Sequence, residues 1–93
     1  MDDLTGFQRD LLYVIAGMDH PSGQAVKDEL DTYYKTTIDH GHLYSNLDIL
    51  VEKGLVEKGR QDRRTNYYEL TDAGEAEIRD RRAWRTQYIE LEV

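Results

Sequence analysis

The chain has 93 residues, the size of one small domain built from short elements. It contains no cysteine, which excludes disulfides, thiol redox sensing and cysteine metal sites. Nineteen acidic and twelve basic residues give a net charge of −7, which on average disfavours a nucleic-acid partner. Because no stretch approaches the ~20 apolar residues of a membrane span and no signal peptide is recognisable, we expect a cytoplasmic protein without a membrane partner.

Two helices are predicted in the first third of the chain. Thr5 and Gln8 have the spacing of a capping box, so a helix is expected from Asp3 or Thr5 to Met18. Pro21 ends it, and a second helix runs from Ser22 or Gly23 to Tyr34. Apolar residues at spacings of three and four mark the inward faces: Phe7, Leu11, Val14, Ile15 and Met18, then Ala25, Val26, Leu30 and Tyr33 or Tyr34. The β-branched run 36–38 is compatible with a three-residue strand.

The run LVEKGLVEKG contains the same five residues twice, and the two copies are predicted to differ in structure. A third helix begins between Asp39 and Gly41 and ends with the first copy, because Gly54 suits the position just past a helix end. The second copy opens a strand, which is followed by a polar, basic turn and a second strand over 65–70. Thr71 can cap a last helix over 72–91.

This order of elements predicts a mainly α fold with a small β-hairpin, a winged helix-turn-helix with an added C-terminal helix. Residues 1–71 would form the DNA-binding part, and residues 72–93 a dimerisation helix within the same compact domain. That helix has two apolar sectors, more than one surface helix needs to bury. The first contains Ala73, Trp84, Tyr88 and Leu91, and the second contains Ile78 and Ile89. We therefore predict a two-fold homodimer in which Trp84, Tyr88 and Leu91 contribute to the interface.

Two surfaces are candidates for a contact with double-stranded DNA. On the third helix, the face opposite the Leu43, Leu47 and Leu50 stripe is free to enter the major groove, and its first turns carry Gly41, His42, Tyr44 and Ser45. The second surface is the hairpin, because the segment 53–64 carries +3 whereas the rest of the chain carries −10. Its cations are predicted to contact phosphates or the minor groove; they are Lys58, Arg60, Arg63 and Arg64. Because neighbouring residues of a strand point to opposite faces, Tyr67 and Tyr68 lie on different faces, and Tyr67 is a further candidate for a DNA contact.

Other chemistries find little support in the sequence. His40, His42 and His20 lack the spacing of a zinc site, so they are interpreted as polar residues near helix starts and no metal or cofactor is expected. Asp28, Glu29 and Asp31 are interpreted as a charged helical face rather than an acid/base pair. An enzyme is not expected, because no nucleophile, paired base or metal cluster is recognisable.

Two long motifs resemble a known family. The run 43–56, LYSNLDILVEKGLV, and the run 63–74, RRTNYYELTDAG, are similar in sequence and order to the PadR family of winged-helix transcription regulators. With the acidic composition, the chain most resembles the haloarchaeal branch, over about residues 5–90. The resemblance implies a homodimer formed through the last helix, operator binding by the third helix and wing, and repression. The alternative is a winged-helix protein-interaction module without DNA binding, which the acidic surface favours; any small-molecule effector stays unknown.

Overall fold

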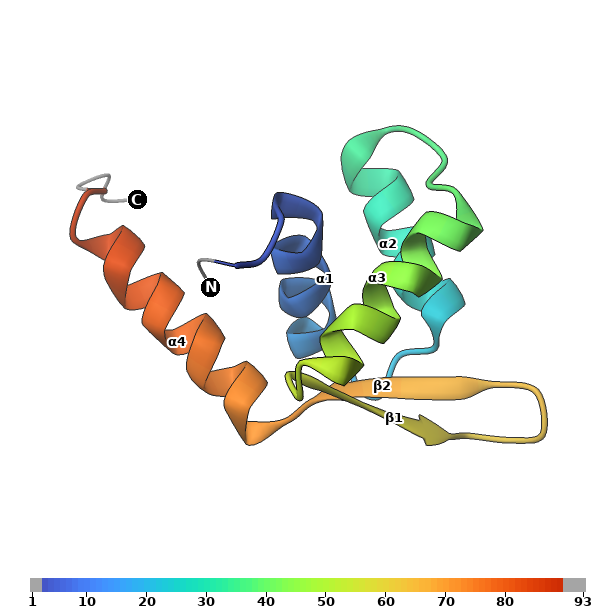
Figure 1. Ribbon diagram of the computed structural model, residues 1–93. Helices are drawn as coiled ribbons and strands as arrows, with labels where there is room; N and C mark the ends of the chain where they lie inside the picture. The colour runs from blue at the N-terminus through green and yellow to red at the C-terminus, as the bar shows by residue number, and fades with distance from the viewer. Residues whose placement is uncertain (1–2, 90–93) are drawn as a thin grey trace.

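The computed structural model describes residues 3–89, which form four helices and one antiparallel hairpin (Figure 1). The elements follow the order α1 (Gly6–Gly17), α2 (Gly23–Tyr34), α3 (His40–Glu52), β1 (Val56–Arg60), β2 (Asn66–Leu70) and α4 (Asp72–Thr86). In the hairpin, Val56 lies opposite Leu70 and Arg60 opposite Asn66. The predicted winged helix-turn-helix is therefore confirmed. The hairpin projects to one side of the three-helix body and α4 rises on the other side.

Side-chain caps explain where the helices begin. Thr5 and Gln8 form the predicted capping box, with Thr5 Oγ1 accepting from Gln8 N and Gln8 Oε1 accepting from Thr5 N, both at 3.1 Å. The other three helices have a hydroxyl or carboxylate at the same position, which satisfies a free first-turn N–H. These caps are Ser22 for α2, Asp39 for α3 and Thr71 for α4. Thr71 also lies where the predicted division between residues 1–71 and 72–93 falls.

The repeated pentapeptide adopts two conformations, as predicted. In the first copy, α3 ends at Glu52, and Gly54 has φ +76°, which a residue with a Cβ adopts only with strain. In the second copy, Leu55 and Val56 are buried and Val56 begins β1. The same letters therefore close a helix and open a strand, because Gly54 turns the chain and tertiary contacts decide the second copy.

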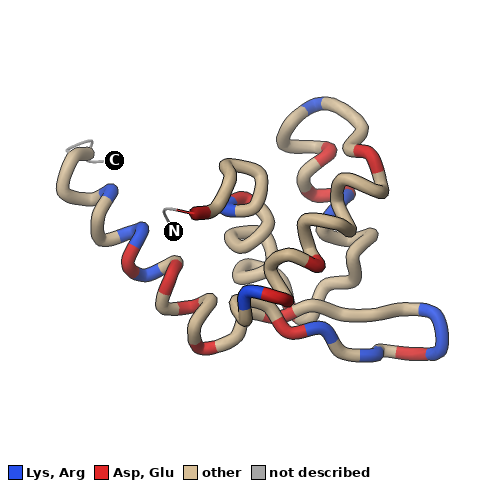
Figure 2. The backbone as a smooth tube through the Cα atoms, in the orientation of Figure 1, with Lys and Arg blue, Asp and Glu red and all other residues tan. Residues whose placement is uncertain are grey.

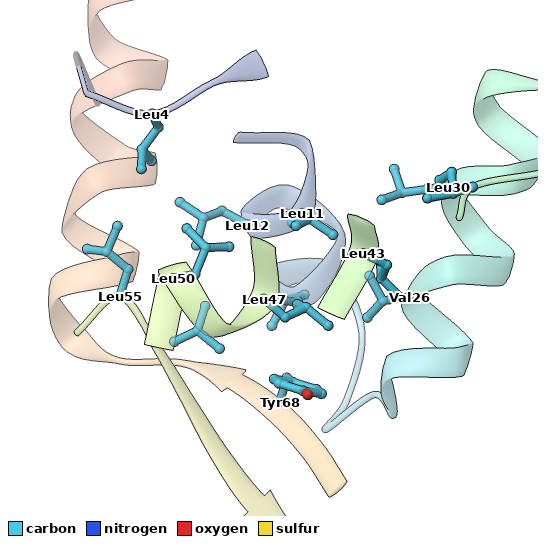
Figure 3. Packing of buried hydrophobic residues seen from close by; sticks show 13 residues of the cluster. Leu4, Leu11, Leu12, Val26, Leu30, Leu43, Leu47, Leu50, Leu55 and Tyr68 are labelled. Atoms are coloured by element: carbon cyan, nitrogen blue, oxygen red, sulfur yellow. The ribbon is translucent and has the colours of Figure 1, made fainter. Parts of the chain in front are cut away.

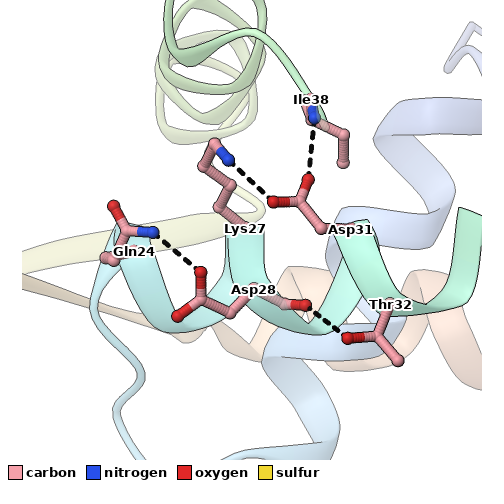
Figure 4. Close-up of polar contacts among 6 residues, drawn as sticks. All are labelled: Gln24, Lys27, Asp28, Asp31, Thr32 and Ile38. Carbon is pink, nitrogen blue, oxygen red and sulfur yellow. Dashed lines mark hydrogen bonds and ion pairs between the residues drawn. The ribbon is translucent and has the colours of Figure 1, made fainter. Parts of the chain in front are cut away.

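No strand forms at 36–38, where the β-branched run was compatible with one. The N–H of Ile38 donates to Asp31 Oδ1 at 2.7 Å, so it is used by a side chain instead of a neighbouring strand. Asp31 also accepts from the Nζ of Lys27 at 2.7 Å, and only 7% of the Lys27 side chain is exposed (Figure 4). The Lys27 ammonium, followed by the Ile38 N–H, lowers the pKa of the Asp31 carboxyl. These contacts fix the turn between α2 and α3.

The hairpin instead pairs with the link between α1 and α2. Ser22 forms an isolated antiparallel bridge with Tyr67, and the N–H of Tyr68 donates to the carbonyl of Pro21 at 2.9 Å. β2 is thereby hydrogen-bonded to the two residues that precede α2, Pro21 and Ser22. The start of α2 and the wing consequently form one connected unit.

The core lies between α1, α2, α3 and the hairpin (Figure 3). The α3 stripe of Leu43, Leu47 and Leu50 is fully buried, and Tyr68 from β2 packs beneath it with 2% exposed. The predicted inward faces of α1 and α2 are confirmed at Leu11, Ile15, Val26 and Leu30, which are all buried. Of the two candidate tyrosines, Tyr34 packs against the core and donates to Asp10 Oδ2, whereas Tyr33 is 74% exposed.

The last helix is shorter than predicted. It ends at Thr86, and Leu91 lies outside the described residues. Ile78 packs against the core, whereas Ile89, predicted on the same sector, is 51% exposed because it follows the helix end. Trp84 and Tyr88 lie 5.2 Å apart between ring centroids and are 49% and 67% exposed. The outer part of α4 therefore leaves aromatic surface uncovered within the described chain.

Candidate nucleic-acid interface

The outward face of α3 begins with small and polar residues. Gly41 and Ser45 are exposed, while Leu43 and Leu47 on the opposite side are fully buried. The Ser45 hydroxyl donates to the His42 carbonyl at 3.3 Å, which is long for a hydrogen bond between two oxygens. A helix with one buried stripe and a face of this kind is able to approach the floor of a DNA major groove.

His42 is turned toward α1 rather than straight outward. Its ring lies 4.6 Å from the Phe7 ring at an interplanar angle of 31°, and its Nδ1 is 3.4 Å from Asn46 Nδ2. Asn46 Nδ2 also donates to the His42 carbonyl at 2.8 Å, and Asn46 Oδ1 accepts from Gln8 Nε2 at 2.8 Å. His42 is still exposed, but it occupies the flank of α3 beside α1.

The buried Gln8–Asn46 pair is a feature that our sequence reasoning missed. Only 6% of Gln8 and 9% of Asn46 are exposed, so both amides are removed from water. A signal was present, because Asn46 falls at helical spacing among Leu43, Leu47 and Leu50 and so belongs to the buried stripe. The pair connects the first turn of α1 to the middle of α3 and sets the position of the candidate reading helix.

Tyr44 is directed away from His42, toward the start of α2. Its ring packs on Gly23, where an added Cβ would lie 2.5 Å from the ring carbon Cε1. It also stacks with the His40 ring at a centroid distance of 6.2 Å and an angle of 7°. Tyr44 therefore lies on the side of α3 that faces α2 and the wing.

The four predicted wing cations are exposed along the hairpin and its turn (Figure 2). Asp62 shapes the turn, because its Oδ1 accepts from the N–H groups of Arg64 and Thr65, each at 2.9 Å. These N–H groups, Arg64 first, lower the pKa of the Asp62 carboxyl. Within the turn, Arg63 and Arg64 form no ion pair with a described residue, whereas Lys58 Nζ lies 3.9 Å from Asp48 Oδ1. The two arginines are thus available to an external anion.

Tyr67 and Tyr68 lie on opposite faces of β2, as strand alternation requires. The Tyr67 ring stands over Gly59 and meets the His20 ring edge-on at 5.0 Å. Tyr67 is half-buried by these contacts. The structure therefore places Tyr67 at the base of the wing. It is less exposed than the other predicted DNA-contact residues.

His20 was considered in the sequence only as a weak metal ligand, and the structure gives it a different place. Its φ is +46°, and its two ring nitrogens lie 2.7 Å from Asp19 Oδ1 and 2.9 Å from Glu69 Oε2. The hydrogen bond to Asp19, with the charge of Glu69, raises the pKa of the His20 imidazolium. Among residues 3–89, no group of three or more histidine and carboxylate side chains is placed to hold a metal ion.

One cavity brings part of the two predicted surfaces together. Tyr44 of α3 and Arg64 of the wing both line a cavity of about 430 Å³ at the start of α2. His42 lies on the other flank of α3, beside Phe7, and Tyr67 lies beside His20. The site thus has a centre at Tyr44 and Arg64, with Gly41 and Ser45 on the exposed face of α3.

Comparison with known proteins identifies the family. The model of the transcriptional regulator PadR-like family matches residues 11–80, which is more than half of the chain. The chain belongs to this PadR-like family. The structure of RosR from H. salinarum, a haloarchaeal PadR-type regulator, superposes with a TM-score of 0.90 at 44% identity, over 98% of this chain and 82% of that chain. The resemblance to the haloarchaeal branch is thereby confirmed, and this PadR-like chain is a transcriptional regulator.

More distant structures share the fold of this PadR-like regulator. FabT from Streptococcus pneumoniae, solved in complex with DNA, has a TM-score of 0.77 at 24% identity, over 95% of this chain and 59% of that chain. PcaV from Streptomyces coelicolor, a transcriptional regulator, has a TM-score of 0.73 at 22% identity, over 85% and 55%. No curated protein matches the chain significantly. Within residues 3–89, none of the helices is long and apolar enough to cross a membrane.

Proposed function

We propose that this PadR-like regulator binds operator DNA as a homodimer and represses transcription in the cytoplasm, without a cofactor and without enzymatic activity. In this proposal, α3 enters the major groove with Gly41, His42, Tyr44 and Ser45 near the bases or the adjacent phosphates. The wing cations Lys58, Arg60, Arg63 and Arg64, with Tyr67 at the base, contact the neighbouring backbone or minor groove.

The observation that carries the proposal is the meeting of α3 and the wing at one cavity, where Tyr44 and Arg64 lie together. Arg63 and Arg64 stand at the tip of a hairpin that is anchored to α2 through Ser22 and Tyr67, so their charge is held at a defined place. On a molecule of net charge −7, an exposed basic tip next to a free helix face supports an anionic partner with a groove.

The homodimer is supported by the outer part of α4. Trp84, Tyr88 and Ile89 are between 49% and 67% exposed and line one apolar depression together with Arg85. The Arg81 guanidinium lies 4.7 Å above the Trp84 ring. Exposed aromatic surface of this kind, on the opposite side of the molecule from the wing, suits a two-fold contact that leaves both wings free.

DNA retention by two charge-matched variants tests the proposal. Arg63→Ala combined with Arg64→Ala should weaken binding to all duplexes alike, because phosphates carry no sequence information. Arg79→Ala combined with Arg82→Ala removes the same charge from α4 and should retain DNA binding. His42→Ala or Ser45→Ala should instead change the sequence recovered by selection from random DNA.

Each outcome has a distinct meaning. Equal retention by the wild type and the wing variant would overturn the DNA-binding role of the wing. A folded wild-type dimer that retains no duplex, while capturing a protein partner, would favour the protein-interaction module instead. An unchanged sequence preference in both α3 variants would show that another face of α3 reads the bases.

A further inference from the structure

The cavity between the start of α2, α3 and the wing is lined by polar residues and carries a single positive charge. Arg64 is its single charged lining residue, and none of the lining residues carries a carboxylate. By contrast, Asp10 and Glu29 line the cavity between α1 and α2, and Glu69 and Glu75 line that between α1 and α4. A polar cavity with one cation and no carboxylate suits an anion, whereas the depression beside Arg85, which also lacks carboxylates, is lined by apolar side chains.

The first turn of α2 contributes a positive electrostatic potential to this cavity. Ser22 Oγ accepts from the N–H of Ala25, which leaves the N–H of Gln24 without a partner among residues 3–89. Free N–H groups and the helix dipole both favour an anion at the N-terminus of a twelve-residue helix. Gln24 is exposed, so the anion can arrive from solvent.

An unpaired hydroxyl on a buried tyrosine also points to a polar ligand. The Tyr68 ring lies beneath Leu47 in the core (Figure 3), only 2% of the residue is exposed, and the side chain lines the cavity. Its hydroxyl makes no hydrogen bond to any of residues 3–89, so it is free to donate to a ligand in the cavity. Burial, with the charge of Asp48, raises the pKa of Tyr68 to about 12, so the hydroxyl keeps its proton and remains a donor.

Tyr44 adds a second hydroxyl at the same place. A Cβ built on Gly23 would lie 2.6 Å from the Tyr44 hydroxyl oxygen, so this oxygen sits directly beside the first residue of α2. Only glycine at position 23 allows the ring to approach this closely. The Tyr68 backbone is tied to Pro21 by a hydrogen bond of 2.9 Å, so the two hydroxyls and the helix start are held in a fixed arrangement.

We propose that this cavity binds one backbone phosphate of the DNA duplex. The Tyr44 and Tyr68 hydroxyls and the N–H of Gln24 donate hydrogen bonds to it, and Arg64 provides the charge. The site rests on the DNA-binding function proposed above and adds a contact to it that lies between the reading helix and the wing. Because α2, α3 and β2 all contribute to one phosphate site, binding there fixes the register of α3 on the duplex.

Removing single hydroxyl groups tests this site. Tyr68→Phe and Tyr44→Phe should each weaken binding roughly tenfold, for a random duplex and for a duplex recovered by selection alike, because each loses one hydrogen bond to a charged group. Their salt dependence should stay that of the wild type, whereas Arg64→Ala should shift the slope of log affinity against log salt by about 0.9. Tyr13→Phe is the matched control, because it also removes one unpaired tyrosine hydroxyl but on α1, away from the cavity, and DNA binding by this variant should not change.

A duplex in which single phosphates are replaced by neutral methylphosphonates gives a second readout. In each half-site, one replacement should weaken wild-type binding but have a much smaller effect on the Tyr44→Phe, Tyr68→Phe double variant. Circular dichroism establishes that each variant is folded, and Gly23→Ala, which displaces the Tyr44 ring, provides an independent variant.

Two results overturn the proposal and are distinguishable. If the folded Tyr68→Phe and Gly23→Ala proteins bind like the wild type while the Arg63, Arg64 variant loses binding, the phosphate site is refuted and the DNA-binding function stands. If the wild-type dimer binds no duplex at all, the DNA-binding function and the site fail together.

Discussion

Replacing Gln8 with leucine is expected to destabilise the fold by more than its near-neutral volume change suggests. Gln8 Nε2 donates to Asn46 Oδ1 at 2.8 Å, and both residues are at least nine-tenths buried. The substitution leaves Asn46 Oδ1 without its donor in the core, at a cost of about 1–3 kcal/mol. The substitution also removes the acceptor for the Thr5 N–H, which is half of the capping box, at a further cost in stability of about 0.5–1 kcal/mol.

The sum is about 1.5–4 kcal/mol, which lowers the Tm of a domain of this size by at least roughly 6 °C. Asn46→Leu should cost a similar amount, because the Gln8 amide is then left unpaired. The double variant should lose about 1–2 kcal/mol less stability than the sum of the two single losses. Two leucines that replace both partners leave no orphaned amide at their contact.

Urea unfolding followed by circular dichroism, in about 1 M KCl to screen the acidic surface, measures all four proteins. Gln24→Leu is the control, because Gln24 is exposed and its hydrogen bond to Asp28 Oδ1 lies in solvent. It should change the free energy of unfolding by less than about 0.5 kcal/mol. Strictly additive effects of Gln8→Leu and Asn46→Leu would refute the conclusion that the two amides depend on each other.

Three further predictions concern assembly, pH and salt. Trp84→Ala should shift the protein from dimer to monomer in light scattering, because Trp84 is 49% exposed on the uncovered part of α4; a wild type that is already monomeric would contradict the proposed interface. The raised pKa of His20 means that the folded state favours the imidazolium, so its contribution to stability is complete below its ordinary pKa of 6.5 and is lost as pH rises through the raised value. NMR titration should give a His20 pKa above 6.5, and this pKa should fall when Glu69 is replaced by glutamine. A His20 pKa at or below 6.5 would contradict the contacts of His20 with both Asp19 and Glu69. Affinity for operator DNA should stay flat or rise between about 0.5 and 2 M salt. Ions are released only where the basic wing meets phosphates, whereas the acidic body must take up cations when it comes close to the DNA, and this uptake is favoured by salt. A folded dimer that binds best at low salt and loses affinity steadily as salt is added would exclude this.

Much of the fold could be predicted because it depends on local interactions. The Thr5–Gln8 capping box, the end of α3 just before Gly54 and the hairpin between two β-rich runs each involve residues close in sequence. The run 36–38 shows the limit of such reasoning. Its β-branched residues favoured a strand, but Asp31, seven residues before Ile38, accepts the N–H that a strand would have used.

The candidate site was predicted less completely, because its geometry depends on contacts between distant residues. The basic hairpin and the exposed α3 face were recognisable from charge and spacing. The orientation of His42 toward Phe7, the packing of Tyr44 on Gly23 and the pairing of Gln8 with Asn46 across 38 positions were not. Side-chain direction on a helix flank is decided by what packs beside it, and that neighbour comes from another element.

The sequence by itself determined the element order, the helix caps, the buried leucine stripes and the segregation of positive charge at 53–64, because each follows from periodicity or from neighbours along the chain. Only the tertiary structure decided that Tyr44, Tyr68 and Arg64 line one cavity at the start of α2, since three elements must pack before these side chains meet. The bridge between Ser22 and Tyr67 belongs to the same class. Backbone hydrogen bonds between segments 45 residues apart leave no periodic trace in the sequence, and they form only when the core has brought the segments together.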